Sequence, residues 1–150
     1  MVEELLSMGV SVKTKDHRWR TALHLAAEKG HTKTLLVLGG HQNADTDARD
    51  IYGSTPLHLA ARKGHEATVG LLVRDLLADP MPRANSGLMP LHLAARYGHS
   101  ATVPALVYDL NADPTAQDHM DRTAWDHAID RETQHVLAGV SKEHPQHTYR

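Results

Sequence analysis

An eleven-residue motif recurs three times in this chain at a constant interval of 34 residues. The copies run from Thr21 to His31, from Thr55 to His65 and from Met89 to His99, and each holds Leu-His-Leu-Ala-Ala, two variable residues and Gly-His. A weaker fourth copy, Thr123 to Ala128, follows at the same interval. A repeat of this length is one unit that cannot bury its apolar face alone, so the units must stack to form a continuous core.

The contents of the unit predict a turn followed by two helices. Turn residues such as Asp50 to Ser54 come first, and Thr55-Pro56 then begins a helix, because proline at the first helical position loses no hydrogen bond. Each of these helices ends at a glycine that tolerates a left-handed cap: Gly30, Gly64 and Gly98. A second apolar segment follows. A 34-residue period also suits tetratricopeptide repeats, so the motif must decide between the families.

The motif Thr55-Pro56-Leu57-His58 resembles the signature of the ankyrin repeat family, in which a β-turn precedes two helices. The resemblance covers about residues 2 to 139 and implies an all-α solenoid of helix-turn-helix units with β-hairpin-like loops. We predict one array over residues 1–139 and a flexible tail over 140–150. Its parts are a partial unit 1–15, units 16–49, 50–83 and 84–117, and a truncated unit 118–139.

Two hairpins depart from this pattern. Trp19 and Asp121 stand where the central units have Gly53 and Gly87. Because glycine alone adopts the left-handed conformation freely, we expect these two turns to be distorted.

The thirteen histidines raise the question of a metal site. Six of them recur with the repeat: His24, His58, His92, His31, His65 and His99. Equivalent residues lie in successive layers about 10 Å apart, too far to share an ion at bond lengths of about 2 Å. We therefore expect no metal. The resemblance implies instead that the Leu-His histidines hydrogen-bond backbone and hydroxyl groups between units.

Composition and motifs favour a non-catalytic protein without a cofactor. The chain has 41% hydrophobic residues, a net charge of −2 and no cysteine, and it lacks an apolar run of the roughly 18 residues that a membrane span needs. Glu3 and Glu4 occupy the region where a signal peptide carries positive charge, so we expect a cytoplasmic or nuclear location. No nucleophile elbow, phosphate-binding glycine loop or zinc-protease motif occurs.

The surface left for function is the concave face, which in ankyrin arrays consists of hairpin tips and the outer side of the first helix. The period places eleven of the sixteen basic residues there, opposed by Glu28 and Asp130. We predict a monomeric adaptor or scaffold that binds an acidic protein segment. Nucleic acid or a phosphorylated small molecule is the alternative partner, and simple solubilisation is the alternative role of the bases. The predicted contacts are Arg18, Arg20, Lys29, Arg49, Tyr52, Arg62, Lys63, Arg83, Leu88, Arg96, Tyr97, Met120 and Arg122.

Overall fold

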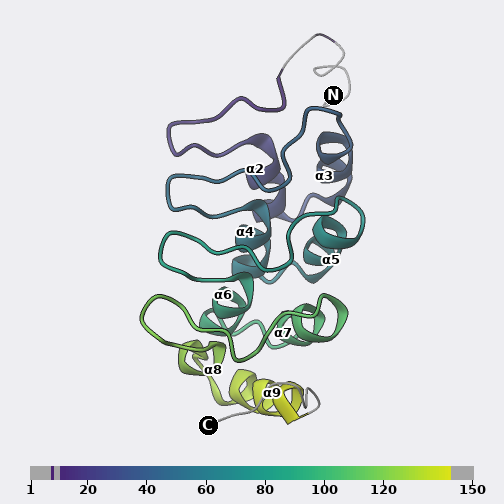
Figure 1. The fold of residues 1–150 in the computed structure, drawn as a ribbon. Helices are drawn as coiled ribbons and strands as arrows, with labels where there is room; N and C mark the ends of the chain where they lie inside the picture. The colour runs from purple at the N-terminus through teal and green to yellow at the C-terminus, as the bar shows by residue number, and fades with distance from the viewer. Residues whose placement is uncertain (1–7, 9–10, 143–150) are drawn as a thin grey trace.

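The computed structural model describes residue 8 and residues 11–142, and within these every regular element is helical. The units stack along one axis, with the hairpins projecting on one side, a column of inner helices in the middle and a column of outer helices on the other side (Figure 1). This confirms the predicted all-α solenoid. The inner helices are α2 (Ala22–Lys29), α4 (Pro56–Lys63), α6 (Pro90–Arg96) and α8 (Ala124–His127). The outer elements are α3 (Thr32–Gly39), α5 (Glu66–Arg74), α7 (Thr102–Pro104), the π-helix η1 (Ala105–Asp109) and α9 (Arg131–Lys142).

The core lies between the two columns of helices. The first leucine of each motif is almost fully buried, with exposures of 1%, 1% and 2% for Leu23, Leu57 and Leu91. The alanine pairs of the inner helices are buried as well, and their small side chains allow α2, α4 and α6 to contact one another. Each unit therefore buries its apolar face only against its neighbours, as a solenoid requires.

A buried histidine near the start of each complete inner helix bonds to a backbone carbonyl beyond that helix. The His58 Nδ1 accepts a hydrogen bond from the Thr55 amide at 3.0 Å, so its proton lies on Nε2, which donates to the Leu88 carbonyl of the next hairpin at 2.9 Å. His24 bonds in the same way to Ser54 of the hairpin that follows it, whereas the His92 Nε2 donates to the Ala116 carbonyl in the exit loop of its own unit. The family resemblance implied that these histidines bond both backbone and hydroxyl groups of another unit. The hydroxyl that contacts His58 is that of Thr55 in the same unit, so the bond between units goes to the Leu88 backbone carbonyl.

The hairpins keep one geometry even where glycine is missing. Gly53 has φ of +74°, and Trp19 and Asp121 adopt nearly the same backbone with φ of 61° and 59°. The Trp19 amide also donates to the Asp16 carbonyl at 2.9 Å, as the Gly53 amide does to Asp50. The predicted distortion of these turns is therefore wrong. The left-handed conformation is kept at a cost of about 1–2 kcal/mol, because stacking between hairpins fixes the turn.

The last outer helix is longer than the sequence predicted. α9 continues to Lys142, and Val140 is only 3% exposed within the core cluster. Val136 and Val140 lie one turn apart and so share the inward face with Leu137. Residues 140–142 thus belong to the array rather than to the predicted tail. Residues 143–150 and most of the predicted half unit 1–15 lie outside the described residues.

We predict that Leu57→Ala lowers the free energy of unfolding by about 2–5 kcal/mol, because it leaves a cavity between stacked units. The control is Leu77→Ala, which truncates a leucine that is 81% exposed. Urea titration of both variants measures the difference. A loss below about 1 kcal/mol for Leu57→Ala would contradict the role of this leucine in the core.

The buried histidines predict a stability that falls in weak acid. Burial lowers the pKa of His58 from 6.5 to about 4, and it also lowers the pKa of His24 and His92. Below pH 6.5 the unfolded chain therefore binds more protons than the folded one. Each buried ring then destabilises the fold by up to about 1.4 kcal/mol per pH unit until its folded pKa is reached.

The free energy of unfolding, measured by urea titration at pH 7, 6 and 5, should fall at each step. His58→Gln should have a shallower slope, and the control His119→Gln, which changes an exposed side chain, should keep the slope of the unsubstituted protein. A free energy that is constant over this range would show that the buried rings are not held neutral by the fold.

Candidate functional site

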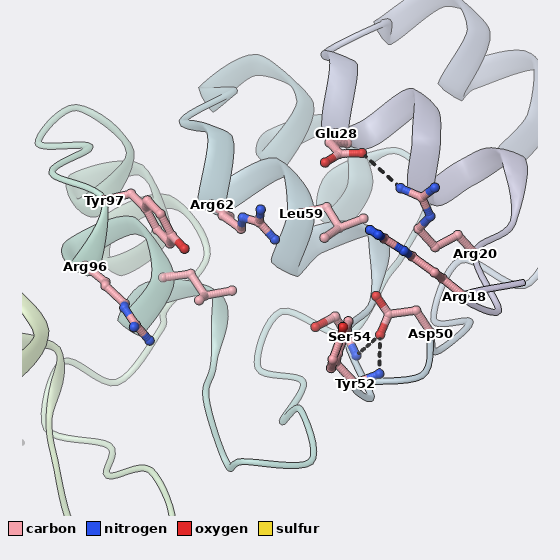
Figure 2. Close-up of a pocket in the computed structure, with 11 residues that line it drawn as sticks. Arg18, Arg20, Glu28, Asp50, Tyr52, Ser54, Leu59, Arg62, Arg96 and Tyr97 are labelled. Atoms are coloured by element: carbon pink, nitrogen blue, oxygen red, sulfur yellow. Dashed lines mark hydrogen bonds and ion pairs between the residues drawn. The ribbon is translucent and has the colours of Figure 1, made fainter.

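A groove of about 540 Å³ runs across the hairpin side of the first three complete units (Figure 2). We call it the inner groove. It combines hairpin residues with residues of α2, α4 and α6, and thus three layers of the stack contribute to one surface. Its lining residues are Arg18, Arg20, Glu28, Asp50, Tyr52, Ser54, Leu59, Arg62, Leu93, Arg96 and Tyr97.

The inner groove has an apolar floor and a basic, aromatic rim. Leu59 and Leu93 form the floor, where they are 6% and 9% exposed. Arg62 and Arg96 follow them by three residues on α4 and α6, a spacing that places each leucine and arginine on the same side of its helix. The repeat therefore builds the same leucine–arginine pair twice, in adjacent layers.

The backbone of the groove is held by the Gly-His histidines. The His99 Nε2 donates to the Arg62 carbonyl at 2.7 Å, and the His65 Nε2 donates to the Glu28 carbonyl at 2.9 Å. Each histidine belongs to the unit after the residue that it holds, so the bond also sets the distance between layers. In the last unit Thr133 occupies the histidine position, and its buried Oγ1 has no hydrogen-bond partner.

The arginines of the groove differ in how far their charge is already neutralised. Arg20 pairs with Asp16 at 2.9 Å and with Glu28 at 3.5 Å. In contrast, no ion pair within the described part of the chain involves the three other arginines of the groove, Arg18, Arg62 and Arg96. Arg62 instead lies over the ring of Tyr97, 5.7 Å from its centroid. Three guanidinium groups of the groove thus lack an ion-pair partner among the residues that the structure describes.

The structure brings together six of the thirteen predicted contacts: Arg18, Arg20, Tyr52, Arg62, Arg96 and Tyr97. The others do not line the inner groove: Lys29, Arg49, Lys63, Arg83, Leu88, Met120 and Arg122. Sequence reasoning missed the floor residues Leu59 and Leu93. The signal was present, because each precedes a predicted arginine by three residues on a predicted helix.

Two of the predicted contacts have a structural role. Arg49 donates to the Gly53 carbonyl at 2.8 Å and to the Arg83 carbonyl of the next hairpin. Arg83 repeats the pattern, donating to Gly87 at 3.2 Å and to Gln117 at 2.7 Å. These two side chains form a ladder that joins successive hairpins, and their donors face carbonyls of the protein itself.

The predicted face is also less basic than its count of lysines and arginines suggested. Three hairpins begin with an aspartate, and the carboxylates of Asp16, Asp50 and Asp118 accept hydrogen bonds from backbone amides of their own turns. These acids lie beside the predicted bases because the turn needs an acceptor at that position. The hairpin side of the array therefore carries both signs of charge, and the acids Glu28 and Asp50 line the inner groove together with its arginines.

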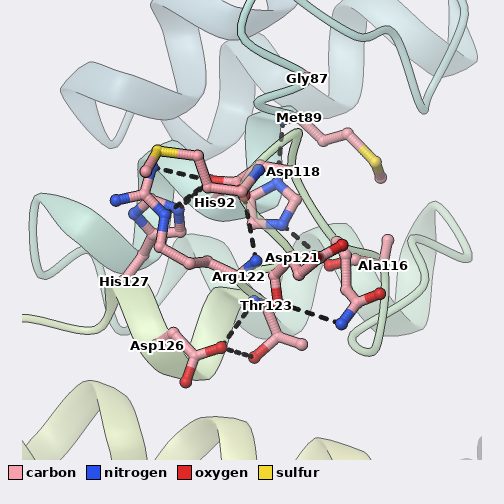
Figure 3. Close-up of polar contacts among 12 residues, drawn as sticks. Gly87, Met89, His92, Ala116, Asp118, Asp121, Arg122, Thr123, Asp126 and His127 are labelled. Carbon is pink, nitrogen blue, oxygen red and sulfur yellow. Dashed lines mark hydrogen bonds and ion pairs between the residues drawn. The ribbon is translucent and has the colours of Figure 1, made fainter.

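The fourth unit contains a second polar cluster, centred on Asp118 (Figure 3). Its carboxylate accepts from the His127 Nε2 at 2.8 Å and pairs with Arg122 at 3.0 Å. Burial raises the pKa of Asp118, but hydrogen bonds from the Arg122 amide, His127 and the Met120 amide outweigh it and hold the pKa well below its usual range. The carboxyl side chain is 1% exposed and that of His127 is 5% exposed, so this acid–histidine pair offers no access to a substrate.

No helix in residues 8 and 11–142 is long and apolar enough to cross a membrane. In the same part of the chain, no three histidine or carboxylate side chains are grouped so that they could hold a metal ion.

The stacked hairpin and two-helix units define a helical repeat solenoid. A family profile described as ankyrin repeats in three copies matches residues 1–83 and 34–118. The chain belongs to the ankyrin repeat family, as the sequence predicted. No curated protein is a significant match to it. Ankyrin repeats generally mediate protein–protein interaction, and the family is typically non-catalytic.

We predict that Arg83→Met destabilises the fold by about 1 kcal/mol, since two carbonyls lose a charged donor at an exposed site. Arg96→Met is the matched control, because Arg96 is exposed and forms no ion pair within the described residues. Urea titration compares the two. Equal stabilities would mean that the arginine ladder does not contribute to the stack.

Proposed function

We propose that this protein is an interaction module that binds an acidic protein segment in the inner groove. The observation that carries the proposal is the combination of free guanidinium groups from Arg18, Arg62 and Arg96 with an apolar floor. Guanidinium groups bind carboxylates in a planar, bidentate geometry. The floor offers a place for an apolar side chain of the same ligand.

The aromatic residues of the rim support a protein partner. Tyr52 and Tyr97 are 63% and 49% exposed, although both have large apolar rings. Tyrosine and arginine are the residue types that most often dominate binding energy at protein interfaces, where they surround buried apolar anchors. The inner groove presents both types around Leu59 and Leu93.

The acids of the groove favour a peptide over a nucleic acid. Glu28 and Asp50 line the same surface as the arginines, and Asp130 stands one repeat after Arg96. A polyphosphate backbone carries charge at every nucleotide and would meet these carboxylates. A peptide can place its acidic side chains only where the arginines lie.

The test uses a synthetic peptide with two glutamates separated by prolines and a leucine. We expect the double reversal Arg62→Glu with Arg96→Glu to weaken its binding at least tenfold, about 1.4 kcal/mol. The matched control reverses Lys33 and Arg74, two exposed bases on the outer helices α3 and α5. Calorimetry at two salt concentrations measures all three proteins, and urea titration confirms that each is folded.

Equal weakening by the groove pair and the outer pair would contradict the proposal, since binding would then follow total charge alone. Single-stranded DNA of equal charge serves as the competing probe. Tighter binding of the DNA, with an affinity that falls steeply as salt is raised, would identify nucleic acid as the ligand instead.

A further inference from the structure

The eighth residue of each motif copy, counted from Thr21, Thr55, Met89 and Thr123, forms a charge pattern along the stack. The four equivalent positions hold Glu28, Arg62, Arg96 and Asp130. Glu28 is neutralised by Arg20, and the Asp130 carboxylate accepts the Thr133 amide at 2.7 Å. Free positive charge at this position is thus restricted to the two central layers.

The distance between the two helices that carry these arginines favours one backbone conformation of a bound peptide. α4 and α6 pack directly against each other, and packed helices lie about 8–10 Å apart. A polyproline II segment has three residues per turn and rises about 3.1 Å per residue, so its residues i and i+3 share one side about 9 Å apart. In a β-strand, residues i and i+3 point to opposite faces. Two acidic side chains three residues apart on a polyproline II segment therefore match the separation expected between adjacent helices, whereas the same pair on a β-strand would face opposite sides.

An α-helix could also match the spacing, with acidic residues seven positions apart. However, a helix with its side chains is about 10–12 Å wide, whereas a polyproline II segment is a thinner, extended chain. The exposed rings of Tyr52 and Tyr97 favour the thinner ligand, because polyproline II segments dock on aromatic-lined grooves.

We infer that the partner segment is a polyproline II stretch with two acidic side chains three residues apart. This inference rests on the proposed function. The two carboxylates pair with Arg62 and Arg96, and an apolar residue between them lies over Leu59 and Leu93. The stacking of Arg62 on Tyr97 and the bond from His99 to the Arg62 carbonyl hold the first of these contacts in place.

The experiment compares three synthetic peptides of equal net charge against the unsubstituted protein. The first is proline-rich with Glu-x-x-Glu, the second has the same composition with Glu-x-Glu, and the third is an alanine-rich helix with glutamates seven residues apart. We expect the first to bind at least tenfold more tightly than the other two. The control is charge exchange: the protein with Arg62→Glu and Arg96→Glu should prefer Lys-x-x-Lys over Lys-x-Lys in the same peptide frame.

The outcomes separate this inference from the proposed function. If all three acidic peptides bind equally, the three-residue spacing is overturned while an acidic partner stands. Tightest binding of the helical peptide overturns the polyproline II ligand and again leaves the acidic partner intact. If no acidic peptide binds, or if single-stranded DNA binds more tightly than all of them, both proposals fail.

Discussion

The stack depends on the hydrogen bonds of three buried imidazoles. Because Nδ1 of His24, His58 and His92 accepts a bond within its own unit, Nε2 carries the proton and needs an acceptor, which the following hairpin supplies to His24 and His58 and the exit loop of its own unit supplies to His92. For His24 and His58, loss of the following unit would leave this donor unpaired, at a cost of about 1–3 kcal/mol. The fourth unit avoids this problem with Asp126, whose carboxylate accepts from the Thr123 amide and hydroxyl and has no proton to donate. The histidines at this position in the first two complete units thus join neighbouring units, and Asp126 makes its bonds within its own unit.

The groove follows from the same constraint. Once each hairpin is fixed to the inner helix before it, the tips align, and one backbone bond joins each to the next, as from the Ile51 amide to the Arg18 carbonyl at 3.0 Å. A second set of histidines fixes the carbonyls of Glu28 and Arg62 on the groove side. The backbone at Glu28 and Arg62 is therefore hydrogen-bonded to the layer that follows it. Such a surface is largely formed before a partner arrives, which reduces the entropy lost on binding.

The period of the sequence was sufficient to predict the helices, the buried leucines and the side of the array that carries the groove. It was not sufficient to predict which arginines are free. Arg49 and Arg62 are both bases at repeat positions, but Arg49 lies four residues before the hairpin glycine and reaches its carbonyl, whereas Arg62 lies over the ring of Tyr97. Whether an arginine side chain reaches an acceptor depends on the three-dimensional structure, which the repeat period does not give. The array was predicted to end at residue 139 for a similar reason. That Val140 belongs to the core becomes clear only from its packing beside Leu137 in the folded structure.

The departures from the repeat carry information that the repeat itself does not. Residues that are identical in every repeat make the same contacts in every layer. A ligand that contacted only such residues would bind equally well at any layer of the stack. Glu28 and Asp130 stand at the position that Arg62 and Arg96 occupy in the central layers, so the charge at this position differs from layer to layer. Trp19 breaks the run of hairpin glycines and keeps a strained backbone with a ring that is 60% exposed beside Arg18 and Arg20 of the groove. Each departure makes contacts of its own: Glu28 pairs with Arg20, Asp130 accepts the Thr133 amide at the start of α9, and the Trp19 ring lies under the Lys15 ammonium group.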